Sequence, residues 1–322
     1  MFDPKQIIAR AGQRLENPAY PGRRLAFIHS AIALGCSLVL TLISYFLNHQ
    51  VAGTGGLGGI GTRTVLQSAQ SVLSLGLSIC MPFWEYGFVA AAMGYSRQEQ
   101  VGPQSLLKGF HKFGPLLRLM ILQLLLYTLL LTTAVQIASS IVVLTPLGQG
   151  MMDTMQLLAE DQAFLQTGVL TEEIMMSLVQ AAMPAYIAGL VLFALVAVPV
   201  AYRLRLAAYG VLDGERKALR ALLSSNRIMR GNCLGFFKLD LHLWWYWVLQ
   251  LLCSLLAFGD VLLPALGVQL PVSADAAMFI FYGAQSVLAL LLAWRWRAGV
   301  ETTFAVAYDS LLPKPEPTNT EN

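Results

Sequence analysis

The sequence is poor in charged residues, which make up 12% of its 322 residues, against about 25% in an ordinary globular domain. Hydrophobic residues make up 56% of the chain. A soluble protein with so little charge would have to expose apolar side chains to water, whereas a lipid bilayer accepts them. The composition therefore argues against an ordinary soluble domain and favours an integral membrane protein.

The chain also lacks the motifs of common enzymes and metal proteins. Its four cysteines have no metal-ligand spacing and suggest no disulfide framework. It contains no phosphate-binding loop ending in Gly-Lys-Ser, no His-Glu-x-x-His and no Gly-x-Ser-x-Gly. We therefore expect no cofactor, no metal site and no catalytic residues, and we expect a protein that is not a conventional enzyme.

What the sequence does contain is six long apolar runs. A helix needs about 20 residues to cross the hydrocarbon core of a bilayer, and its backbone polar groups must be satisfied within the segment. The predicted fold class is therefore all-α, a polytopic membrane bundle of six transmembrane helices. The predicted spans are residues 25–47, 65–93, 115–144, 184–209, 239–263 and 276–296.

Three regions follow from these runs. Residues 1–24 are predicted to form a cytoplasmic amphipathic helix, residues 25–308 the membrane domain, and residues 309–322 a disordered cytoplasmic tail. Arg63 is the only one of the 21 Lys and Arg residues that falls on the outer side of this arrangement. Because basic residues favour the cytoplasmic side, we expect both termini in the cytoplasm and the protein in the cell (plasma) membrane.

The connection between the first two spans is rich in glycine. Residues 53–63 contain Gly-x-Gly-x-x-Gly twice, a pattern that can hold a dinucleotide when it follows a strand and opens a helix. Here it follows a predicted transmembrane helix on the outer side. We therefore interpret it as a flexible external hairpin.

Three basic stretches have the pattern of helices that lie on a membrane: residues 1–24, 105–113 and 214–231. Such helices bury an apolar face in the bilayer while their charges contact anionic headgroups. Short elbows packed on the bundle would give the same pattern. The candidate headgroup contacts are Arg216, Lys217, Arg220, Arg227 and Arg230.

Glu85 is a carboxylate inside the second predicted span, just after Pro82. An ionisable side chain at this depth is costly and is by default a functional hypothesis. It could relay a proton or a cation, or it could form a structural pair with Arg203 or Arg205 at the end of the fourth span. These three residues form the candidate intramembrane polar site.

The segment after the fourth span, LRALLSSNRIMRGNCLGFFKLDL, resembles the bacterial membrane family called domain of unknown function 975. The matching positions are Ser225, Met229, Gly231, Phe236 and Trp244. The opening FDPKQIIARAGQRL, the element LLKGFHKF and the closing FAVAYDSLL are also similar to that family, whereas the glycine-rich first connection and the acidic connection after the third span depart from it. The resemblance implies a bacterial multi-pass membrane protein and no established activity.

Two functions stay open at this point, with an intramembrane enzyme acting on lipid as a weaker third. The first is a non-enzymatic membrane protein that binds lipid or a partner protein at the cytoplasmic surface. The alternative is a small transporter or permease component that uses Glu85. The expected partners are anionic headgroups of the bilayer and a further membrane protein, and not nucleic acid.

Overall fold

The computed structural model describes residues 3–16, 20–52, 57–145, 156, 172–265, 267 and 272–312. This part of the chain is helical and contains no strand. Its helices are α1 (Pro4–Glu16), α2 (Gly22–Ala52), α3 (Leu57–Ser96), η1 (Pro103–Leu107), α4 (Lys108–His111), α5 (Phe113–Val143), α8 (Glu172–Leu204), α9 (Ala207–Leu212), α10 (Ala218–Met229), α11 (Cys233–His242), α12 (Trp244–Leu256), α13 (Gly259–Ala265), α14 (Ala274–Leu292), η2 (Ala293–Arg297) and α15 (Ala298–Leu311).

The all-α prediction is confirmed for the described residues, and so is a set of long apolar helices. Five helical segments are long and apolar enough to cross a membrane, and a bent pair of helices raises the number to six. The five segments cover Gly22–Phe46, Gln67–Ser96, Phe113–Val143, Met175–Leu212 and Ala276–Leu311.

The fifth predicted span, residues 239–263, is not one straight helix. The chain bends by 65° between α11 and α12, at Leu243, and α12 ends at Leu256 before the short α13. Phe236 and Leu239 of α11, Leu243 at the bend and Tyr246 of α12 are all buried in the same core. The sequence pattern predicted the apolar run, but it did not predict the bend at Leu243.

The sixth predicted span also differs at its end. The helix continues past residue 296 through the π-helix η2 and α15 to Leu311. Residues 309–311 of the predicted disordered tail are therefore helical, because α15 packs one face on the core and Asp309 bonds to Arg97. The rest of the predicted tail, residues 313–322, lies outside the described residues.

The glycine-rich connection is shorter than predicted. Helix α3 begins at Leu57, so residues 57–63 of the predicted hairpin are helical, and only 53–56 lie outside the described residues. Glycine is a poor helix former, but a 40-residue helix can include a few such positions.

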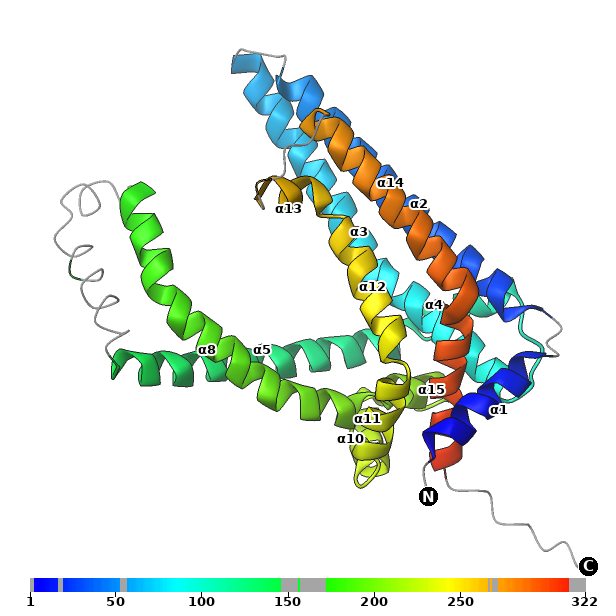
Figure 1. Cartoon of the computed structure of the whole chain (residues 1–322). Helices are drawn as coiled ribbons and strands as arrows, with labels where there is room; N and C mark the ends of the chain where they lie inside the picture. Colours follow the sequence, from blue (N-terminus) through cyan, green and yellow to red (C-terminus); the bar gives the residue numbers. More distant parts are fainter. Residues whose placement is uncertain are drawn as a thin grey trace, which may run out of the picture.

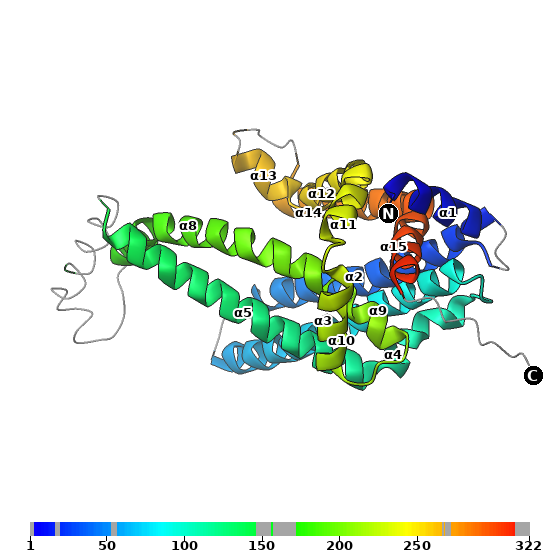
Figure 2. The ribbon, with the colours of Figure 1, turned by 90° about the horizontal axis from the view of Figure 1, so that it is seen from below.

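The long helices form two groups that diverge from one end of the molecule (Figures 1 and 2). One group is a bundle in which α14 lies beside α2 and α12, and α2 lies beside α3. The other is the antiparallel hairpin of α5 and α8. At Gly189 of α8 a Cβ atom would lie 2.9 Å from the Cα atom of Val135 of α5. The hairpin thus relies on a small residue for close approach, as is common between membrane helices.

The short helices and α15 lie together where the two groups meet (Figure 1). We call α1, η1, α4, α9, α10, α11 and α15 the basic layer, because Lys and Arg recur on α1, α4, α10 and α11 and on the connections between these helices. Both described chain ends belong to it, through α1 and α15, which contact each other. This common end fits an even number of spans.

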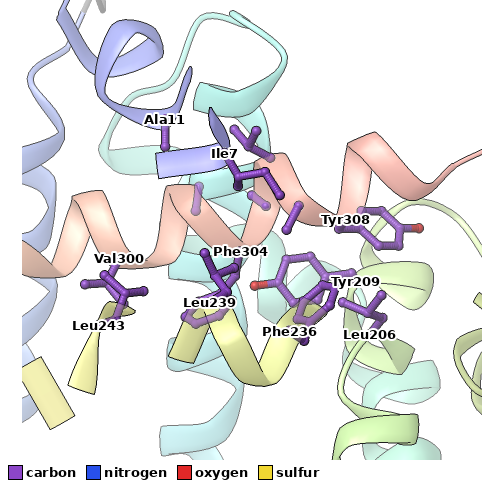
Figure 3. Close-up of a cluster of buried hydrophobic side chains, with 14 of the residues drawn as sticks. Ile7, Ala11, Leu206, Tyr209, Phe236, Leu239, Leu243, Val300, Phe304 and Tyr308 are labelled. Carbon is purple, nitrogen blue, oxygen red and sulfur yellow. The ribbon is translucent and has the colours of Figure 1, made fainter. Parts of the chain in front are cut away.

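The basic layer contains the main hydrophobic core (Figure 3). Ile7 and Ala11 of α1, Phe236 of α11 and Phe304 of α15 are among its buried members. Helix α1, within the region predicted to form a cytoplasmic amphipathic helix, buries its apolar face against protein. Phe236 and Phe304 contribute large buried aromatic surfaces to this core.

Candidate functional site

Glu85 pairs with Arg297. One guanidinium nitrogen of Arg297 donates to Glu85 Oε2, and another lies 3.1 Å from Ser30 Oγ. The guanidinium carbon stands 5.0 Å from the centre of the Phe88 ring. Arg297 thus joins α2, α3 and η2, and the predicted pairing of Glu85 with Arg203 or Arg205 is wrong.

Arg297 reaches Glu85 from a π-helix, which the sequence did not reveal. Residues 293–297 form η2, a single wide turn between α14 and α15. Short π segments inside α-helices occur often at functional sites. In this turn Arg295 is exposed whereas Arg297 is half-buried, so the two arginines have different environments.

His29 lies beside this pair and is fully buried. Its Nε2 atom is 3.1 Å from the Trp84 carbonyl oxygen, and Trp84 Nε1 donates to the His29 carbonyl oxygen at 3.0 Å. The two rings stack with centroids 5.2 Å apart. This double contact joins α2 to α3 at Trp84, the residue directly before Glu85.

Arg205 has a different acidic partner, Asp240 of α11. Both terminal nitrogens of Arg205 bond to the Asp240 carboxylate, the second at 3.2 Å, and Tyr202 Oη donates to it at 2.7 Å. The guanidinium lies 4.1 Å from the centre of the Phe304 ring. Arg203, two residues earlier, is exposed and makes no ion pair with a described residue. Neither Arg203 nor Arg205 therefore forms the ion pair with Glu85.

Glu301 follows Arg297 by one helical turn, where η2 continues into α15. Sequence reasoning missed Glu301, Asp240 and Arg297. We call the two ion pairs, Glu85–Arg297 and Arg205–Asp240, together with Glu301 the ionic chain.

Cavities open on both ends of the ionic chain. One of about 610 Å³ lies between α2 and α3 and is lined by Glu85 together with Ser37 and Ser78. Another of about 450 Å³ is lined by Arg205 and Asp240. Charged residues in the interior of a membrane protein often mark ion or proton paths, and here they separate two cavities.

A second cluster of charges links α3, the α9 end and α15. Arg97 bonds to Asp213 at 2.5 Å and to Asp309 at 2.8 and 3.1 Å, and Ser96 Oγ also donates to Asp309. The hydrogen bond that Arg97 donates to Asp213 raises the pKa of the Arg97 guanidinium above its ordinary value. Arg97 therefore stays charged at any physiological pH, and the cluster works as a structural clamp.

The five predicted headgroup contacts all lie on the exposed side of the basic layer, and none forms an ion pair with a described residue. Helix α10 buries Ala221 and Ser225 and exposes Leu219 and Leu223, which are 60% and 59% exposed. A cavity of about 580 Å³ lies at its start. These five residues are Arg216, Lys217, Arg220, Arg227 and Arg230, of which the first three line that cavity.

Several of the residues on which the family resemblance rests stabilise the fold. Ser225 Oγ donates to the Arg203 carbonyl at 2.8 Å and accepts from Leu206 N, which satisfies the backbone at the break between α8 and α9. Met229 and Phe236 are fully buried, and Gly231 has a φ of 91°. No family model, curated protein or solved structure matches the chain. Membership of that family therefore stays a prediction.

Proposed function

We propose that this protein is a non-enzymatic integral membrane protein whose basic layer binds anionic lipid headgroups on the cytoplasmic side of the plasma membrane. The observation that carries the proposal is the outer face of α10. Leu219 and Leu223 are exposed next to five basic side chains that have no acidic partner among the described residues. An exposed leucine pair is costly in water but favourable in the headgroup and acyl boundary, where basic residues bind phosphates.

Two neighbouring segments also expose apolar side chains beside basic ones, which supports a basic layer that faces the membrane surface. On α11 Leu234 is 74% exposed, and Phe237 and Leu241 follow it at helical spacing, beside Lys238. On the elbow before α5, Leu107 and the basic Lys108 are exposed. The layer thus presents apolar and basic side chains together, which fits a membrane surface better than bulk water.

The test measures which lipids surround the protein. The full chain is reconstituted in vesicles of three parts phosphatidylcholine to one part phosphatidylglycerol and then extracted with its lipids by a polymer that forms nanodiscs. We expect phosphatidylglycerol to be enriched over the vesicle average. Replacing Arg216, Lys217, Arg220, Arg227 and Arg230 with Gln should remove most of the enrichment, because headgroup attraction amounts to about 1 kcal/mol per basic residue.

The matched control keeps the charge. A variant with Arg216, Arg220, Arg227 and Arg230 replaced by Lys should retain the enrichment, since a lysine ammonium attracts anionic headgroups as well. If the Gln variant holds as much phosphatidylglycerol as the parent protein, the basic layer does not select anionic lipid and the proposal fails.

A specific observation favours transport as a second candidate function. The ionic chain separates two cavities, and Glu85 at one end is half-exposed, with 50% of its side chain accessible. We propose that a small transporter of this kind would pass protons or cations at Glu85. In vesicles containing a pH-sensitive dye, Glu85→Gln should abolish proton flux, while Glu99→Gln on the exposed turn after α3 should not. Equal flux in the two variants would count against transport.

A further inference from the structure

A cavity of about 640 Å³ lies where α1, the start of α2 and η2 meet, away from the basic face of α10. It is contributed by three segments that are far apart in the sequence, so it exists only in the folded chain. Its lining residues are Gly12, Leu15, Glu16, Pro21, Gly22, Arg23, Arg295, Trp296, Ala298 and Gly299.

Two arginines from different elements line this cavity. Arg23 belongs to the first turn of α2, and Arg295 belongs to η2. Neither forms an ion pair with a described residue, and the Arg295 guanidinium is held 5.5 Å from the centre of the Trp296 ring. With Glu16 also present, the lining has a formal charge of +1, which matches one singly charged anion. Both arginine side chains are exposed, so they can reach an anion that enters the cavity.

Glycines leave the cavity open. A Cβ atom at Gly22 would lie 3.0 Å from Leu15 and 3.2 Å from Ala298, so the floor is closely packed. At Gly12 and Gly299 a Cβ atom would meet nothing within 4 Å. Any side chain at those two positions would therefore occupy free space beside the arginines.

An apolar surface begins directly beside the arginines. Phe27, one turn after Arg23, and Trp294, next to Arg295, contact each other edge to face with centroids 5.5 Å apart. They are 36% and 49% exposed, and exposed Leu291 continues the surface along α14. Aromatic residues at this position are typical of the boundary between headgroups and acyl chains.

We infer that this cavity holds the phosphodiester of one membrane phospholipid, with the acyl chains along the exposed surface of α2 and α14. Arg23 and Arg295 would donate to the phosphate oxygens, because guanidinium groups bind phosphate through paired hydrogen bonds. This inference rests on the proposed function in placing the basic layer at the membrane surface. It adds a single discrete site, separate from α10.

The test is native mass spectrometry of the full chain, delipidated in detergent and titrated with palmitoyl-oleoyl-phosphatidylglycerol. We expect the first lipid to bind more tightly than later ones. Arg23→Gln with Arg295→Gln should weaken that first binding by about tenfold or more, because two hydrogen bonds to a charged group are lost. Unchanged binding of the first lipid in this variant would overturn the inference.

A steric variant tests the same site with its charges intact. Gly299→Leu places a side chain in the cavity and should weaken the first binding to a similar degree. Gly76→Leu is the matched control, since a Cβ atom there also meets open space, on α3 outside the cavity. If both leucine variants bind the first lipid like the parent, the lipid lies elsewhere.

Two further measurements complete the test. The first distinguishes a lipid phosphate from free inorganic phosphate, and the second distinguishes this inference from the proposed function. Inorganic phosphate at millimolar concentration should displace little lipid; full displacement would identify a free-anion site and contradict a lipid site. The variant with Gln at the five basic positions of α10 and its preceding turn should lose later lipids and keep the first. Loss of the first lipid in that variant, with retention in Arg23→Gln/Arg295→Gln, would overturn this inference and leave the proposed function standing.

Discussion

The basic layer and the spans are packed in different ways. In the span windows only 6–17% of residues are buried inside the protein, with the lowest value in α5. In the layer, by contrast, Phe236, Met229 and Leu206 are at most 2% exposed. In water, helices with so much exposed apolar surface would be unstable. In a bilayer, lipid tails are as apolar as leucine side chains and can cover that surface. Span residues that are fully buried, such as Phe83 and Leu116, cluster with layer residues such as Ala207. The difference teaches that side-chain burial in this chain is concentrated in the layer and where the spans meet it.

The largest expected loss of stability comes from shortening an aromatic side chain in the core of the basic layer. Phe236→Ala should lower the free energy of unfolding by about 3–5 kcal/mol, because the buried ring leaves a cavity in closely packed surroundings. Reversible unfolding in mixed micelles, with increasing amounts of a denaturing detergent, measures the change.

The matched substitution in a span is Leu124→Ala on α5, where the side chain is 66% exposed. We expect a change of about 0.5 kcal/mol or less, as for other substitutions away from packed sites. If Leu124→Ala destabilises the protein as much as Phe236→Ala, the spans contribute a packed core of their own and the comparison is wrong.

The buried ion pair of the layer should give the next largest effect. Arg205 and Asp240 have side chains only 27% and 16% exposed. Asp240→Asn leaves the Arg205 charge without its partner, and the expected loss is about 3 kcal/mol in the same unfolding assay. Replacing both residues, as Arg205→Met with Asp240→Leu, should recover part of this loss.

The more exposed ion pair of Arg97 with Asp213 serves as the comparison for the Asp240→Asn measurement. Arg97 and Asp213 are 31% and 30% exposed, so solvent screens them more. Asp213→Asn should cost about 1 kcal/mol or less. An Asp240→Asn loss no larger than the Asp213→Asn loss would place the ionic chain in a solvated environment rather than a buried one.

The spans were predictable from the sequence because their length and hydropathy are local properties. The first four predicted spans correspond to long apolar helices, although Arg205 and Leu206 interrupt the fourth before α9. The amphipathic pattern of α10 was also visible in the sequence. In the structure, however, Leu219 and Leu223 of this helix are exposed, whereas Met229 is buried. Which apolar face packs on protein depends on residues distant in the sequence.

The ionic chain was not predictable in the same way. Glu85 was found from its depth in a span, but its partner Arg297 is 212 residues away and is brought in by η2. No local pattern distinguishes Arg297 from Arg203 or Arg205, which are also basic residues near the end of a span. The partner is determined by which helices are neighbours, and helix neighbours are a tertiary property.

The last prediction concerns the hairpin, where close packing does occur between two spans. Gly189→Leu would force α8 away from α5, because even a Cβ atom would lie 2.9 Å from the Val135 backbone. We expect a loss of about 1–3 kcal/mol, while Gly283→Leu on α14, where a Cβ atom meets nothing within 4 Å, should be nearly neutral. Hydrogen exchange then separates the regions: amides of α5 and α8 should exchange faster in Gly189→Leu, and those of α15 should not. Faster exchange in α15 as well would mean that the hairpin supports the layer, and would reverse the order of dependence argued from burial.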